Sequence, residues 1–274
     1  MRRARELDAR LRSLRMLGQA VVAMKSLSAH HFRATRAALE PARAYRSGLN
    51  RVLQSTGASL PAGRGAKGIV VIGGELGFCG AYNTQVAAAG AELRAAHGAG
   101  PTYCIGRRAA SYLRRLGVPL DRQYTAPTSM RGITDTLLTV AQDIITDYIA
   151  QDLSSFEVVA NRFEGVGVFH ARSVGLLPVE SRFLPTAPAV RYASRQHVES
   201  VGVRELLYIT MVEVLLDALA SEHGARLLAT KGAERWLNDR IDRLQRHLMA
   251  VRRETSTQEV IEIAANARVR HPEP

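Results

Sequence analysis

The chain has 274 residues and a mass of 29.9 kDa, and 46% of its residues are hydrophobic. This is enough for a folded core and excludes a largely disordered chain. The formal net charge of +12 is concentrated at one end, because residues 1–54 hold 12 basic and 3 acidic residues whereas residues 200–274 hold 11 of each. No segment reaches the roughly 18–20 consecutive apolar residues of a membrane span, so we expect no membrane insertion.

Residues 2–55 contain one proline and two glycines, which allows a long helix. Their apolar residues recur every three or four positions and predict one narrow stripe along that helix. We expect Pro41 to kink or end the first helical stretch near Leu39. The predicted stripe consists of Leu7, Leu11, Leu14, Leu17, Val21 and Met24, and beyond Met24 it weakens through Ser28 and His31.

A Gly/Pro-rich linker at residues 56–67 precedes a short β-branched run at 68–73, which is typical of a buried strand. Strand-like and helix-like segments then alternate, and this alternation predicts a mostly parallel α/β domain over residues 68–195. The helix over 134–150 is expected to bury one apolar face. The predicted strands are 68–73, 101–106, 156–163 and 168–174, the helices are 83–96, 107–116 and 134–150, and the apolar face comprises Leu137, Leu138, Ala141, Ile144, Ile145 and Tyr148.

Residues 203–270 lack proline and carry a heptad stripe, which predicts a second long helix. Each terminal helix needs a partner for its stripe, so we expect helices 1–55 and 203–270 to form an antiparallel coiled coil. Two separate helices lying over the α/β domain remain the alternative. The second stripe consists of Leu237, Ile241, Leu244, Leu248 and Val251 and continues through Thr255 and Gln258.

The glycine-rich turn at residues 74–80 follows the first predicted strand, where phosphate-binding loops lie in nucleotide enzymes. It lacks both the GxGxxG spacing and a P-loop lysine, so tight-turn geometry explains its glycines better. Cys79 and Cys104 have no metal-ligand spacing and are interpreted as reduced thiols, and the adjacent His30 and His31 cannot share one helix face. We therefore predict no catalytic residue, no cofactor and no metal, with a small nucleotide-binding α/β enzyme as an alternative.

The N-terminal arginines suggest another alternative, a basic helical adaptor for nucleic acid. They lack interleaved aromatic residues, so stacking on single-stranded bases is poorly supported. They could still line the phosphate backbone of a duplex. These arginines occupy positions 2, 3, 5, 10, 12 and 15.

Several segments form a recognisable set along nearly the whole chain. They are residues 204–209, 220–231 and 257–263, together with the loop at 77–83, the Ala23-Met24 pair and the strand at 156–163. The motifs Ala-Ser-Glu-x-x-Ala-Arg and Thr-Gln-Glu are the most specific of them. In the same order, these segments resemble the gamma subunit of rotary F-type ATP synthases, with the first three matching the family's C-terminal signature.

The resemblance implies an antiparallel coiled coil of the terminal helices with a Rossmann-like α/β domain inserted between them. It further implies a central rotor shaft that turns inside a ring of three alpha and three beta subunits and couples ion-driven rotation to ATP synthesis. The implied partners are those subunits, the epsilon subunit and the membrane c-subunit ring, with no nucleic acid. The shaft would be non-catalytic and peripheral, on the cytoplasmic face of a bacterial cell membrane.

The resemblance also assigns five candidate contacts between the shaft and the catalytic ring: Met24, Arg252, Arg253, Thr257 and Glu259. Arg253 stands where the family has Gln, so that contact is carried over only in part. Glu75-Leu76 replaces the family's Asp-Arg, and residues 16–22 are more apolar than is usual. These departures suggest a divergent branch, such as a second sodium- or proton-translocating F-type complex.

Overall fold

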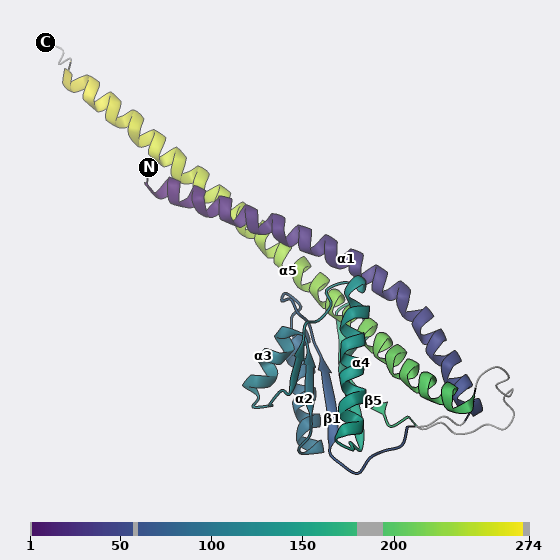
Figure 1. Ribbon diagram of the computed structural model, residues 1–274. Coiled ribbons are helices and arrows are strands. Elements are labelled where there is room, and N and C mark those ends of the chain that lie inside the picture. Colours follow the sequence, from purple (N-terminus) through teal and green to yellow (C-terminus); the bar gives the residue numbers. More distant parts are fainter. Residues whose placement is uncertain (1, 57–59, 180–193, 271–274) are drawn as a thin grey trace. The chain divides into compact units, whose positions relative to one another are not determined.

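The computed structural model describes residues 2–56, 60–179 and 194–270 (Figure 1). The chain divides into two compact units. One contains the described residues of Met1–Ser26 and Thr230–Pro274, and the other is built from Leu27–Ala229. Two long helices, α1 (Arg2–Thr56) and α5 (Arg195–Arg270), each contribute to both units.

The α/β unit is organised around a five-stranded sheet of order β3-β2-β1-β4-β5. Strands β1 to β4 are parallel and β5 runs antiparallel to β4, with Val70 of β1 in register with Tyr103 of β2 and Val158 of β4. The strands are β1 (Lys67–Ile72), β2 (Thr102–Ile105), β3 (Arg122–Tyr124), β4 (Ser155–Gly165) and β5 (Val168–Leu177).

Helices cover both faces of the sheet, which explains why four consecutive β1 residues from Ile69 are buried. Ile69 and Val71 point toward α2 (Tyr82–His97) and α3 (Arg107–Arg115). Val70 and Ile72 point toward α4 (Ile133–Ala150) and the parts of α1 and α5 within this unit. A 3-10 helix, η1 (Met130–Gly132), precedes α4. The predicted fold class, a mostly parallel α/β domain between two long terminal helices, is confirmed.

Two details of the predicted α/β domain are wrong. Strand β3 was not predicted, because its three residues include the exposed Arg122 and Gln123 and form no apolar run. Leu138 was placed on the buried face of α4 but is 56% exposed, because Leu137 takes the position that faces the sheet.

Helix α1 does not end at Leu39 but continues through Pro41 to Thr56. Leu39, Ala42 and Leu53 are at least 90% buried, so tertiary packing holds this segment helical on both sides of the proline. Pro41 itself is exposed. Burial of its neighbours offsets the loss of one backbone hydrogen bond, which costs about 3 kcal/mol in an isolated helix.

Helix α5 begins at Arg195, eight residues before the predicted start at residue 203. Gly202, a poor helix former, lies inside its first turns. A methyl group at Gly202 would collide with the side chain of Leu53 on α1. The two helices therefore approach closely in the α/β unit, and this contact offsets the low helix propensity of glycine.

In the other unit, residues 2–26 of α1 and 230–270 of α5 form an antiparallel pair. Leu11 packs with Leu244 and Leu248 in its core. The direction follows from two ion pairs, because Asp8 meets Arg252 whereas Lys25 meets Glu234. The predicted antiparallel coil of the two chain ends is confirmed in this unit.

On α1, the spacing between successive residues of the stripe alternates between three and four more regularly than predicted. It passes through the half-buried Gly18, whereas Leu17 is 56% exposed. On α5 the stripe ends at Thr255, and Gln258, predicted to continue it, is exposed. None of the helices within the described ranges has a segment long and apolar enough to cross a membrane.

Candidate functional site

The carboxyl end of β1 is the place where open α/β sheets bind ligands, because β1 pairs with β2 on one side and β4 on the other. Here the chain itself fills part of that crevice. The amide of Gly74 donates to Asn83 Oδ1 at 2.7 Å. Glu75 accepts from the amides of Arg107 at 3.0 Å and Ala126 at 3.3 Å, so its carboxylate occupies the N-terminus of α3.

A second carboxylate reaches the same crevice from α5. A methyl group at Gly74 would lie 2.8 Å from Glu222 Oε1. Arg226 forms an ion pair with Glu222, and its Nε donates to the carbonyl of Gly77 at 3.1 Å. Both carboxylates are paired with an arginine, Glu75 with Arg107 and Glu222 with Arg226, and they already occupy the turn at Gly74. An open pocket of about 280 Å³ remains beside residues 77–80, lined also by Asn83, Arg108 and Tyr112. No phosphate-binding motif accompanies it, so the nucleotide-binding alternative gains no support.

Three titratable groups at this crevice, Glu222, His223 and Cys79, are buried. Burial raises the pKa of Glu222, and the neighbouring Arg226 guanidinium opposes that shift. Burial, with smaller contributions from Arg226 and His31, lowers the pKa of His223 to about 3. Burial raises the pKa of Cys79 to about 11. Cys79 is therefore a neutral packing thiol at physiological pH and a poor nucleophile.

His223 is fixed in one tautomer by its neighbours. Arg226 Nη1 lies 3.2 Å from His223 Nδ1, and a guanidinium only donates. His223 Nδ1 therefore accepts and the proton resides on Nε2. The ring of His31 on α1 stacks on His223 with 5.1 Å between centroids. No group of three or more metal-ligating side chains occurs among the described residues.

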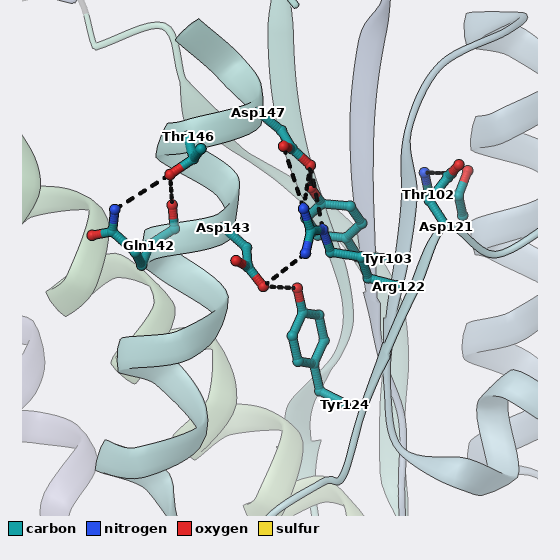
Figure 2. A network of polar contacts seen from close by, with 9 residues as sticks. All are labelled: Thr102, Tyr103, Asp121, Arg122, Tyr124, Gln142, Asp143, Thr146 and Asp147. Atoms are coloured by element: carbon teal, nitrogen blue, oxygen red, sulfur yellow. Dashed lines mark hydrogen bonds and ion pairs between the residues drawn. The ribbon is translucent and has the colours of Figure 1, made fainter. Parts of the chain in front are cut away.

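A second polar network fastens α4 to the edge of the sheet (Figure 2). Arg122 of β3 forms ion pairs with Asp143 at 3.4 Å and Asp147 at 3.3 Å. The hydroxyl of Tyr124 donates to Asp143 at 2.7 Å and that of Tyr103 donates to Asp147. Both carboxylates are matched by donors, so this network is a structural fastening.

The predicted partner contacts lie on the two-helix unit, at two separate levels. Arg252 Nη2 lies 3.5 Å from Asp8 Oδ1, and the side chain of Arg252 is 56% exposed. Arg253 and Thr257 are exposed one turn apart, with Thr257 Oγ1 donating to the Arg253 carbonyl at 2.9 Å. Met24 is half-buried on α1. It lies about 24 Å along the helix from Asp8 at 1.5 Å per residue.

Arg252 and Glu259 are brought together at an open groove of about 380 Å³. Sequence reasoning missed the α1 side of this groove, because the antiparallel register was needed to place it. The groove is lined by Ala4, Arg5, Asp8, Arg252, Thr255, Ser256 and Glu259. Its role in partner contact stays a prediction.

These features define a class of protein: an antiparallel pair of terminal helices with an α/β unit inserted between them in the sequence, whose ligand crevice is partly filled by its own side chains. The family model described as ATP synthase matches residues 3–268. The chain belongs to this family.

The similar curated proteins are gamma chains. The ATP synthase gamma chain of Desulforamulus reducens is 29% identical over 97% of this chain and 99% of that protein. That of Pelotomaculum thermopropionicum is 28% identical over 96% and 97%. The predicted relationship to gamma subunits is confirmed.

Solved structures show the same fold. A chain of the Euglena gracilis mitochondrial ATP synthase, in a structure of OSCP, F1 and c-ring, matches with a TM-score of 0.69 and 15% identity over 98% of this chain and 94% of that chain. A chain from the central stalk and c-ring of the Tetrahymena thermophila mitochondrial ATP synthase matches with a TM-score of 0.61 and 18% identity, over 78% and 99%.

Proposed function

We propose that this chain is the central rotor shaft of an F-type ATP synthase, coupling ion-driven rotation of a membrane ring to ATP synthesis or hydrolysis in a ring of alpha and beta subunits. The observation that carries this proposal is the match to gamma chains over nearly the full length of both proteins. Neither the nucleic-acid adaptor nor the α/β enzyme gains support from these relatives.

The shaft's partners are three alpha and three beta subunits, the epsilon subunit and the c-subunit ring. The similarity to chains in central-stalk and c-ring structures supports the c-ring contact. The chain is a peripheral subunit on the cytoplasmic face of a bacterial membrane and makes no bonds itself. It transmits shape changes to catalytic sites in other subunits.

The two-helix unit suits a shaft that must turn within a bearing. Two packed helices resist bending better than one. Exposed charge pairs contribute only about 0–1 kcal/mol each and would not lock the shaft at one angle. We assign Met24, Arg252, Arg253, Thr257 and Glu259 to contact with the catalytic ring, Met24 at one level and the other four toward the α5 terminus.

Co-expression with the alpha and beta subunits of the same organism tests this function. We expect a complex of three alpha, three beta and one copy of this chain, in which a bead attached to the chain turns in steps during ATP hydrolysis. Failure to assemble with alpha and beta subunits that are otherwise competent would overturn the proposal. Salt-sensitive DNA binding by the purified chain would then favour the nucleic-acid adaptor.

A further inference from the structure

Helix α5 is buried on all sides where it passes through the α/β unit. Every residue from 215 to 226 is buried. A helix in a two-helix coil buries only one stripe, so complete burial over three turns requires contact from every direction. Ser221, Glu222 and Arg226 in this stretch are each at most 4% exposed.

The α/β unit contacts this stretch from the sheet and from α2. Tyr82 Oη donates to the carbonyl of Ala218 at 3.0 Å. Ser221 Oγ lies 3.2 Å from the carbonyl oxygen of Asn161, and the same hydroxyl lies 2.8 Å from that of Asp217 on its own helix. Ala225 packs in one apolar cluster with Cys79 and Tyr82. These contacts fix the position of α5 along and across the sheet.

The β4–β5 hairpin contacts α1 and α5 from another side. The ring of Phe163 lies 5.4 Å from that of Phe32 on α1, and the Arg36 guanidinium lies 4.6 Å over the Phe163 ring. A methyl group at Gly167 in the hairpin turn would collide with Leu228 of α5. The hairpin therefore packs against both helices.

The Glu222–Arg226 pair is the charged link in this enclosure. The loop at 74–80 holds it through two contacts, the Arg226 hydrogen bond to the Gly77 carbonyl and the close approach of Glu222 to Gly74. A buried ion pair adds little net stability over an apolar pair, but breaking it leaves an uncompensated buried charge. Both residues lie on α5, so the bond that opposes rotation of α5 relative to the sheet is the one from Arg226 Nε to the Gly77 carbonyl, and the ion pair with Glu222 holds the Arg226 side chain in place for it.

We propose that Glu222 and Arg226 are positioning residues that lock α5 to the α/β unit, so that torque passes from one to the other without slip. This inference rests on the proposed rotor function. The segment at 215–226 is then where α5 is fixed to the sheet, and the loop at 74–80 serves to hold the Arg226 side chain.

The test uses the assembled, membrane-bound complex and compares ATP hydrolysis with ATP-driven ion pumping. Glu222→Gln removes one charge of the buried pair. Asp239→Asn is the matched control, because Asp239 and Arg243 form an ion pair of the same i, i+4 spacing on the same helix, with side chains 56% and 64% exposed. We expect E222Q to hydrolyse ATP within twofold of the wild type but to pump at least threefold fewer ions per ATP. D239N should match the wild type in both assays.

A second variant shifts the pair without removing a charge. Gly74→Ala places a methyl group 2.8 Å from Glu222 Oε1 and must displace that carboxylate. Like E222Q, this variant should lower the number of ions pumped per ATP. The number of ions pumped per ATP is measured only in complexes that hold all rotor subunits. A purely structural role would lower the yield of such complexes but leave this number unchanged in those that assemble.

Wild-type pumping by E222Q and G74A in complete complexes would overturn the inference, and so would an equal loss in D239N. Failure of both E222Q and G74A to assemble would also overturn it, because the pair would then serve folding. A wild-type chain that forms no rotating complex would instead refute the proposed function, whatever the variants do.

Discussion

The carboxylate of Asp8, near the start of α1, lies 3.5 Å from the guanidinium of Arg252, near the end of α5. The same carboxylate accepts from Arg12 Nη1 at 2.8 Å, one turn along α1. Asp8 therefore neutralises part of a strongly basic helix end and holds Arg252, a residue assigned to contact with the catalytic ring. Asp8 and Arg12 of α1 and Arg252 of α5 thus share one polar site.

Asp8→Asn should leave the free energy of unfolding nearly unchanged, within about 1 kcal/mol, because both arginine partners are well exposed. Urea unfolding of the purified chain measures this change. A loss of several kcal/mol would show that the pair is a structural requirement of the coil.

Leu248→Asp should strongly destabilise the two-helix unit. Leu248 is 4% exposed within the core shared with Leu11, and an unpaired charge there costs about 3 kcal/mol or more. The neighbouring Met249 is 55% exposed, so Met249→Asp is the matched control, with an expected change within about 0.5 kcal/mol. Circular dichroism of thermal unfolding compares the two, and equal effects would refute the assigned stripe.

Gly73→Ala and Gly18→Ala should act in opposite directions. A methyl group at Gly73 would collide with Cβ of Ala109, and the tight packing of α3 on the sheet leaves it no room. At Gly18 no heavy atom lies within 4 Å of the new methyl group, so alanine should stabilise α1 by about 0.5–1 kcal/mol. Differential scanning calorimetry should show a lower melting temperature for G73A and a slightly higher one for G18A.

His223 should make stability depend on pH below neutrality. Burial lowers the pKa of His223 to about 3 in the folded chain, against about 6.5 when unfolded. Unfolding therefore takes up a proton below pH 6.5, so stability is complete above that pH and falls as the pH drops toward 3. One such group predicts a loss of about 2 kcal/mol between pH 7 and pH 5.

His223→Gln should flatten this pH profile, measured by urea unfolding at pH 5 to 8. The exposed His247 on the same helix provides the control, and His247→Gln should leave the profile as in the wild type. His31 adds to the slope in the wild type, because burial, His30 and Arg226 also lower its pKa. An H223Q profile as steep as that of the wild type would contradict the assignment.

Much of this protein is determined by its sequence alone. The apolar spacing of the two chain ends requires long helices with narrow stripes, and the β-branched run at residues 69–72 requires a strand covered on both faces. Local periodicity reports such elements because each one must bury its own apolar face. The quoted motifs identified the family because they recur in order along the chain.

Only the tertiary structure decided the rest. Pro41 remains helical and α5 begins before Gly202 because contacts between the two helices outweigh local propensity. Gly18 replaces Leu17 in the stripe because the coil's register, set across the pair, selects which residues face inward. Likewise, the glycine turn at 74–80 contacts α5 only because Glu222 and Arg226 reach it from a helix about 150 residues further along the chain. Local sequence patterns do not encode a contact over that separation.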